Sequence, residues 1–295
     1  MTTTASEHDA TGPQAAGDAD AAKPIPSLVW WHELLIAAGF YAVYSYVRSR
    51  FGAGPESHDI AYHHALGVVK VEKFFGLWFE PRLQRWYLSL PAHGFIRGWN
   101  IFYGTAHFVV TIGVLIGAFH FAPRIYRFVR TALAGTTALA LVGFSAYTLM
   151  PPRLLGSTSK FGACTGAAVD CHHYGLVDTI ERWGGLWEFG SGKAALVSNQ
   201  YAAMPSLHFG WSSWCAITLV LIIGKGRARW LAFLYPAATL LCILVTGNHY
   251  WLDAFFGGVA LAGGFALAFL ADHHLHRRSF GDRRVVVATA AATDD

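Results

Sequence analysis

The sequence predicts an all-α polytopic membrane protein: a bundle of six transmembrane helices with an amphipathic interfacial segment and a long external loop. The 295 residues are 54% hydrophobic and 15% aromatic, and only 14% are charged. The apolar residues occur in runs of about 20, which is the length needed to cross a bilayer. Most of these runs also lack the polar stripe that surface helices of soluble proteins show.

Both ends of the chain differ in composition from the apolar middle. Residues 1–27 have few bulky apolar residues and three prolines, which predicts a disordered cytoplasmic tail without a signal peptide. Residues 28–271 form the predicted six-span domain, and 272–295 a basic and then low-complexity cytoplasmic tail. The predicted spans are 28–47, 100–121, 131–150, 205–223, 230–246 and 250–271.

Two segments between the spans carry many charges. Within 49–97, the stretch 60–90 alternates charged residues with Phe, Leu and Trp, so it is too charged to cross a bilayer but suited to lie on one. It is either a lipid-access surface or a plain interfacial connector. Residues 123–130 are predicted to be a short loop carrying Arg124, Arg127 and Arg130.

Basic residues set the predicted topology. They gather in 123–130, in 224–229 and in 277–284, and all three segments fall on one side of a six-span chain. The positive-inside rule makes this side cytoplasmic, so both termini are on the cytoplasmic side of the plasma membrane. Loop 154–204 and the turn at Asn248 then lie together outside. The bases flank apolar helices instead of forming a stripe, which argues against nucleic-acid binding.

Polar residues and cysteines suggest further features. Asn100, Tyr103 and His107 share one face of the second span, as either pocket residues or a packing hydrogen bond. Cys164 and Cys171, both in the external loop, are expected to form a disulfide. They precede His172 and His173, but the spacing is not that of a zinc finger, and no metal site or cofactor is predicted. The two cysteines within spans, Cys215 and Cys242, are expected to be packing residues.

Two polar motifs lie where late spans begin. In Asn248-His-Tyr-Trp-Leu-Asp253, a carboxylate one helical turn from His249 can fix the ring tautomer, which leaves the other nitrogen as nucleophile or base. The alternative is a structural hydrogen bond. In Ala203-Met-Pro-Ser-Leu-His208, Pro205 suits the first helical position, and the next amides can bind phosphate. His208 could then protonate a leaving alcohol, or be an ordinary interfacial histidine. With nearby cations these motifs predict a phosphoryl-transfer site.

The motifs are similar to those of a known family. Pro-Ser-Leu-His at 205–208 resembles the Pro-Ser-Gly-His motif of the type-2 phosphatidic acid phosphatase superfamily, and 249–253 resembles the end of its third motif. Together, Pro-Pro-Arg at 151–153, Met-Pro-Ser-Leu-His at 204–208 and Thr-Gly-Asn-His-Tyr at 246–250 look most like the inositolphosphotransferase branch, which includes inositol-phosphorylceramide synthases. The resemblance covers about residues 60–271. It implies a lipid phosphate or phospholipid substrate and a phosphohistidine on His249.

The resemblance also implies roles for other residues. Asp253 would orient His249, His208 would be the general acid, and Arg153, Ser206 and Lys160 would bind phosphate. Two family cations are missing, because the third-motif Ser-Arg pair falls at Cys242 and Ile243 and the first-motif Lys at Ala146. The residues that could replace these cations are Lys160, Arg97, Arg182 and Lys193.

The motifs leave the second reactant open. Water would give hydrolysis, which the family favours, and an alcohol such as inositol would give transfer, which the branch favours. A non-enzymatic transporter would also suit intramembrane His and Asn residues, although the polar groups cluster at one face. An inactive family member is a third reading, because the third-motif Arg is absent.

Overall fold

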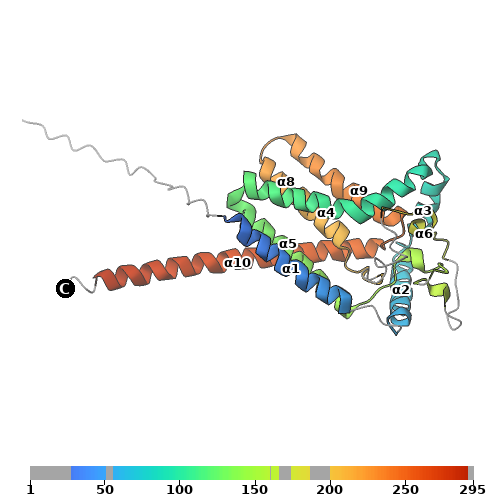
Figure 1. Cartoon of the computed structure of the whole chain (residues 1–295), viewed down its shortest axis with the longest axis horizontal. Helices are drawn as coiled ribbons and strands as arrows, with labels where there is room; N and C mark the ends of the chain where they lie inside the picture. Colours follow the sequence, from blue (N-terminus) through green and yellow to red (C-terminus); the bar gives the residue numbers. More distant parts are fainter. Residues whose placement is uncertain (1–27, 51–55, 160, 166–173, 187–199, 292–295) are drawn as a thin grey trace, which may run out of the picture.

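A computed structural model describes residues 28–50, 56–159, 161–165, 174–186 and 200–291 (Figure 1). Within these ranges the fold is helical, as predicted, and the β contact is an isolated bridge between Leu149 and Ala202. The longer helices are α1 (Trp30–Arg50), α2 (Glu56–Phe74), α3 (Glu80–Ser89), α4 (Ile96–Phe121), α5 (Pro123–Ala146), α8 (Leu207–Ile223), α9 (Leu234–Val245) and α10 (Trp251–Ala291). The shorter ones are α6 (Thr179–Trp183), η1 (Pro91–Phe95), η2 (Pro152–Leu154), η3 (Ala163–Thr165) and η4 (Arg227–Phe233).

Four helical segments of the described chain are long and apolar enough to cross a membrane. They are Ile96–Phe121, Pro123–Ala146, Arg227–Val245 and Trp251–His274. The predicted span 205–223 forms α8, which is apolar but has only 17 residues, and the predicted span 28–47 lies in the less apolar α1. The protein therefore has the helices of a membrane protein, while six spans and an interfacial segment stay predictions.

The predicted loop at 123–130 is wrong. Helix α5 begins at Pro123, because proline has no N–H to satisfy in the first turn and its φ suits a helix start. Arg130 therefore lies on α5, where it pairs with Glu33 of α1, and the Tyr126 hydroxyl donates to the same carboxylate at 3.1 Å. Charges that suggested a loop instead join two helices.

Two other helix ends also differ from the prediction. Helix α5 ends at Ala146, before the predicted end at 150, because the next residues pair with distant backbone. Leu149 N–H donates to Tyr201 O, and Met150 N–H donates to Ala61 O. Helix α10 continues to Ala291, well into the segment predicted to be a tail.

Glycines allow α10 to pack closely against two other helices. A Cβ on Gly264 would come within 2.3 Å of Thr136 Oγ1 and 2.5 Å of Ala132 O, both on α5. A Cβ on Gly257 would come within 2.4 Å of Ser206 O, next to the start of α8. Small residues at membrane-helix crossings bring backbones together in this way. As a result, the first turns of α8 and α10 lie beside each other.

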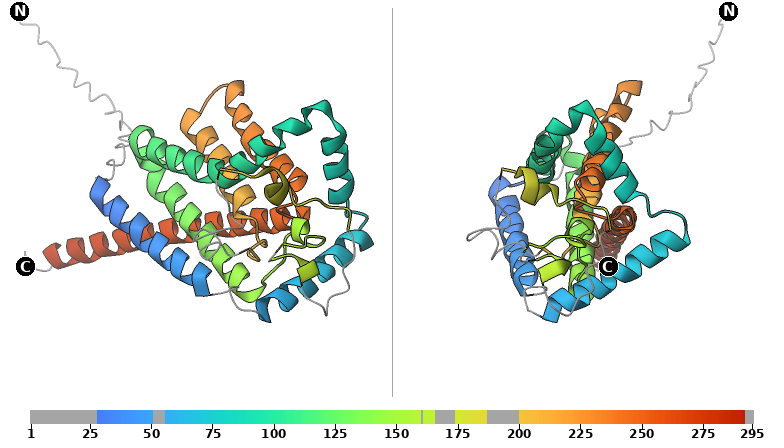
Figure 2. Two further views of the ribbon diagram at one scale, coloured as in Figure 1. Left: turned by 45° about the vertical axis from the view of Figure 1, so that its right-hand side comes forward. Right: turned by 90° about the vertical axis from the view of Figure 1, so that its right-hand side faces the viewer.

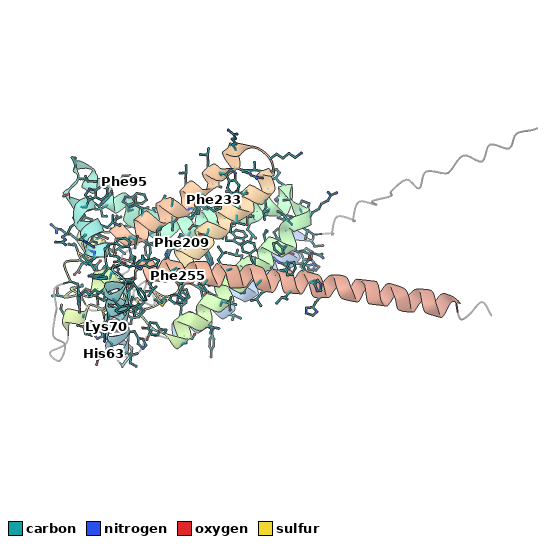
Figure 3. The ribbon with its side chains drawn as sticks, turned by 180° about the vertical axis from the view of Figure 1, so that it is seen from behind. His63, Lys70, Phe95, Phe209, Phe233 and Phe255 are labelled. Atoms are coloured by element: carbon teal, nitrogen blue, oxygen red, sulfur yellow. The ribbon has the colours of Figure 1, made fainter. Side chains whose placement is uncertain are left out.

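Helix α2 runs across the long direction of α10 at the end where α10 begins (Figures 1 and 2). Its inner face packs through Ala61, Ala65 and Val69 in a buried cluster with Leu149 and Tyr250. In the view from behind, His63 and Lys70 of α2 lie farther toward this end than Phe209 and Phe255 (Figure 3). Helices α2, α3 and α6 therefore surround the end of the bundle where both motifs lie.

Candidate active site

The two motifs meet through their backbones at the starts of α8 and α10. Ser206 is the N-cap of α8, with its hydroxyl accepting from Phe209 N–H at 3.5 Å. Its own N–H donates to Asp253 O at 2.8 Å, so the first motif is held directly against the second. Pro205 follows a cis peptide bond and precedes the N-cap, which corrects its predicted place as the first helical residue. The first-turn amides of α8 are therefore those of Leu207 and His208.

Asp253 orients His249, as the spacing of the second motif predicts. The His249 Nδ1–H donates to Asp253 Oδ2 at 3.2 Å, and Tyr250 N–H donates to the same oxygen at 3.0 Å. Asp253 is fully buried and His249 is only 3% exposed. A carboxylate bound to Nδ1–H leaves Nε2 with its lone pair, so Nε2 is the reactive atom of the ring.

His208 of α8 faces this reactive atom. Its Nδ1 lies 3.2 Å from His249 Nε2, within hydrogen-bond distance. The His208 ring stacks on Tyr103, with ring centroids 4.2 Å apart, and contacts His107 edge-on at the same centroid distance. Two helix starts and one face of α4 thus bring His208, His249 and two of the predicted pocket residues together.

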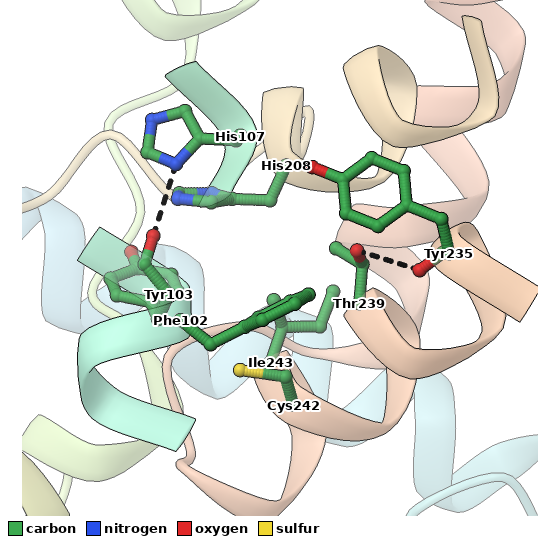
Figure 4. Close-up of a pocket in the computed structure, with 8 residues that line it drawn as sticks. All are labelled: Phe102, Tyr103, His107, His208, Tyr235, Thr239, Cys242 and Ile243. Carbon is green, nitrogen blue, oxygen red and sulfur yellow. Dashed lines mark hydrogen bonds between the residues drawn. The ribbon is translucent and has the colours of Figure 1, made fainter. Parts of the chain in front are cut away.

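A small aromatic pocket lies between α4, α8 and α9 beside His208 (Figure 4). His107 Nδ1–H donates to Tyr103 O at 3.0 Å, which fixes this edge of the pocket. The pocket is lined by Phe102, Tyr103, His107, His208, Tyr235, Thr239, Cys242 and Ile243. Most of these side chains are apolar or aromatic, so the surroundings of His208 on this side are largely apolar.

Asn100, the third residue of the predicted pocket face, fastens α4 to α6. Its Nδ2 donates to Thr179 O and to Gly184 O, each at 2.8 Å, and its Oδ1 accepts from Thr179 Oγ1–H at 2.9 Å. The side chain is buried. These contacts are those of the alternative interpretation, a packing hydrogen bond between helices.

Arg153 is the cation that contacts the turn before His249. Its Nε–H donates to Asn248 Oδ1 at 2.9 Å, and its N–H donates to Gly247 O at 2.8 Å. The other two guanidinium nitrogens donate to Asp178 Oδ2 and Gln200 Oε1, each at 2.6 Å. Within the described residues, side-chain acceptors take three of the five guanidinium N–H groups, and the others can bind an anion.

We expect Arg153→Ala to lower the free energy of unfolding by about 3–5 kcal/mol, because it removes the cation paired with the buried Asp178 carboxylate. Thermal unfolding of the purified protein in detergent measures this loss. The double variant Arg153→Ala, Asp178→Asn should recover part of it, since the uncompensated charge is gone while Asn can still cap α6. A double variant less stable than Arg153→Ala would contradict this account.

The other predicted cations are not seen at the site. Lys160 and Lys193 lie outside the described residues. Arg97 is exposed, and the Arg182 guanidinium lies over the Trp183 ring at 4.7 Å. Cys242 and Ile243, at the place of the family's Ser-Arg pair, are fully buried. Among the predicted cations in the described part of the chain, Arg153 is therefore the one that binds the turn before His249.

The cysteines divide as expected between loop and spans. Cys164 is disulfide-bonded, while Cys215 and Cys242 are free and buried. Cys171, the expected partner, lies outside the described residues, and so the pairing stays a prediction. His172 and His173 lie outside them as well.

Two carboxylates next to the site were not predicted. Glu80 Oε1 accepts from Trp251 N–H at 3.0 Å, and Glu72 Oε1 accepts from Leu252 N–H at 3.3 Å. A signal for Glu72 was present, because it follows Val68 and Val69 by four and three residues and so lies on the apolar face of α2. A buried charge on an apolar face needs a partner, which could have marked it as a residue of the site.

A family model described as the PAP2 superfamily matches residues 66–268. The matched region contains both motifs, Arg153 and the pocket residues of α4. A search of curated proteins and a search of solved structures each found no match.

Proposed function

The chain belongs to the PAP2 superfamily, whose model matches more than half of it, and from this premise we propose that it cleaves or transfers a phosphoryl group of a lipid phosphoester through a phosphohistidine on His249. Membership of this family suggests phosphoester hydrolysis or transfer. The observation that carries the proposal is the pair of histidines from two helix starts, one of which is oriented by a buried Asp. The proposal includes a lipid substrate, an alcohol such as inositol as the acceptor in a transfer reaction, and a place in the inositolphosphotransferase branch.

In the first half-reaction, His249 Nε2 attacks phosphorus and the bond from phosphorus to the leaving oxygen breaks. His208, in its protonated form, donates a proton to that oxygen, so the alcohol leaves neutral. Asp253 stays ionised and stabilises the positive charge that develops on the His249 ring through Nδ1–H. The products are the free alcohol and the phosphohistidine.

In the second half-reaction, His208 takes a proton from water or from an alcohol, and the oxygen of that molecule attacks phosphorus. The bond between phosphorus and Nε2 breaks, and His249 is restored. Water gives hydrolysis. An alcohol acceptor such as inositol gives transfer, and the alternative of inositol-phosphate transfer to a lipid alcohol uses the same two histidines.

Four groups are proposed to bind the phosphate oxygens. The first is the start of α8 with the amides of Leu207 and His208, because a helix start attracts anions. Arg153 offers its unused guanidinium N–H groups beside Asn248. Ser206 can donate its O–H while its oxygen caps the helix, and Lys160 is proposed as a further cation.

The position of His208 requires movement during the reaction. A nucleophile and the reacting phosphorus must approach to roughly 3–3.5 Å. His208 Nδ1 already lies 3.2 Å from His249 Nε2, so it occupies the place that phosphorus needs. Substrate must therefore displace the His208 ring before it can receive a proton from it.

The location of the site supports an enzyme better than a transporter. His249, Asp253 and His208 lie at the ends of α8 and α10, whereas a transporter usually binds its substrate near the bilayer midplane. Arg124 lies at the start of α5, whose last turn packs on Pro205, and Lys225 follows the end of α8 that is opposite the site. By the positive-inside rule the site then faces the outside of the plasma membrane.

The test is product analysis with a panel of lipid phosphates and phospholipids, with and without inositol. Purified protein should release phosphate or an alcohol, and inositol should yield a new phosphoester if the reaction is transfer. Intact cells should convert a short-chain lipid phosphate that cannot cross the membrane. Absence of turnover on the whole panel would overturn the proposed function, and turnover only after permeabilisation would overturn the orientation.

A further inference from the structure

Three buried carboxylates bind the start of α10. The consecutive amides of Tyr250, Trp251 and Leu252 donate to Asp253 Oδ2, Glu80 Oε1 and Glu72 Oε1 respectively. Glu72 is 1% exposed, and Glu80 and Asp253 are fully buried. A helix start usually has one capping side chain, and it comes from the chain just before the helix. Here two caps come from α2 and α3, about 170 to 180 residues earlier in the chain.

Each carboxylate also has a second oxygen for which the described part of the chain provides no hydrogen-bond partner. These are Glu72 Oε2, Glu80 Oε2 and Asp253 Oδ1, all buried. A buried ionised oxygen without a donor carries a large desolvation cost. Within the described residues, no three His, Cys, Asp or Glu side chains are arranged to hold a metal ion. The ligand that two neighbouring carboxylates can share without further groups is a proton.

The charges around the two glutamates agree with a shared proton. Burial and then the charge of Glu80 raise the pKa of Glu72 to about 9, with a further contribution from Asp253. Burial also raises the pKa of Glu80. From α10 the facing groups are Asp253 and the buried Tyr250 hydroxyl, which donates to Met150 O. The charged neighbours on α2 and α3 are exposed to solvent, namely Lys70, Lys73, Arg82 and Arg85.

We propose that Glu72 and Glu80 share one proton and act as positioning residues, which hold the first turn of α10 and with it His249 and Asp253. The pair then keeps one negative charge behind Asp253, and this charge favours the positive charge that develops on His249 when phosphorus is attacked. Loss of the shared proton places two charges side by side and separates α2 from α3. The catalytic part of this inference rests on the function proposed for His249.

The first test measures stability and needs no substrate. The folded protein keeps the proton on Glu72 that the unfolded chain loses above its ordinary pKa, so stability falls as pH rises from about 5 to about 9. Glu72→Gln keeps an oxygen for Leu252 N–H and removes the titration. We expect the difference in melting temperature, Glu72→Gln minus wild type, to become steadily more positive as the pH rises over this range.

Asp59→Asn is the matched control, because it neutralises an exposed carboxylate on the same helix. Its melting temperature should follow wild type at every pH. If Glu72→Gln also follows wild type, the shared proton is refuted. This result is independent of whether the protein turns over lipid phosphates, so it separates failure of this inference from failure of the proposed function.

The second test measures kinetics. The double variant Glu72→Gln, Glu80→Gln keeps both amide acceptors but removes the negative charge, and we expect kcat to fall about tenfold or more with KM unchanged, as for other residues that orient catalytic groups. Glu72→Gln should move the alkaline limb of the pH–rate profile to higher pH. Wild-type kcat in the double variant, or an unmoved alkaline limb in Glu72→Gln, would overturn the positioning role.

Discussion

His249→Asn is expected to lower kcat on lipid phosphates by at least about 10³-fold, in the range of losses that follow removal of a covalent nucleophile. The Asn side-chain amide can still donate to Asp253 Oδ2, as His249 Nδ1–H does. It provides no nitrogen lone pair in place of Nε2, so no phosphoenzyme can form. The measurement is the initial rate of product formation by the purified variant.

A trapping experiment makes this prediction specific to the mechanism. Wild-type protein quenched during turnover should carry acid-labile phosphate, and His249→Asn should carry none. The melting temperature of the variant should stay close to that of wild type, because the buried carboxylate keeps a donor. Wild-type turnover in His249→Asn, or phosphate trapped on that variant, would contradict the proposed nucleophile.

His208→Asn is expected to lower kcat/KM, which reports the first half-reaction, by about 10²–10⁴-fold on an alkyl phosphoester, the usual contribution of a general acid. The loss in kcat/KM should be much smaller on p-nitrophenyl phosphate, because that leaving group departs without a proton. The ratio of the two losses is the measurement. It separates proton donation from a general effect of His208 on the shape of the site.

His107→Asn provides the control for His208. Its ring lies against His208, with centroids 4.2 Å apart, and donates to Tyr103 O, whereas the hydrogen bond to His249 comes from His208. We expect His107→Asn to reduce the rates on both substrates by similar factors. Equal losses on both substrates in His208→Asn would show that His208 is not the acid.

The contact between His249 and Asp253 could be predicted because its geometry is local. His249 and Asp253 are four residues apart, and that spacing brings their side chains together at the start of a helix. The start of α8 was also visible in the sequence, although Pro205 lies before the N-cap rather than in the first turn. The meeting of the two motifs was expected only from a count of spans, and the contact of Ser206 N–H with Asp253 O supplies its physical basis.

Errors arose where long-range contacts decided the outcome. Arg130 looked like a loop residue by charge, but Glu33 of α1 pairs with it and makes it part of α5. For Asn100 the sequence left two interpretations open, a pocket residue or a packing hydrogen bond, and its amide donates to the backbone of Thr179 in α6 and of Gly184 at the end of α6. A sequence shows which residues are polar, and it does not show which partner will satisfy them.

The membrane class, the helical fold and the His249–Asp253 pair follow from the sequence, because hydrophobic length and helical spacing are properties of short stretches. The surroundings of that pair depend on the tertiary structure. Gly257 lets α8 approach α10 so that His208 reaches His249, and α2 and α3 bring Glu72 and Glu80 to amides about 170 to 180 residues away. Buried polar groups must find hydrogen-bond partners wherever the packed helices place them, and only the packing determines which ones they meet.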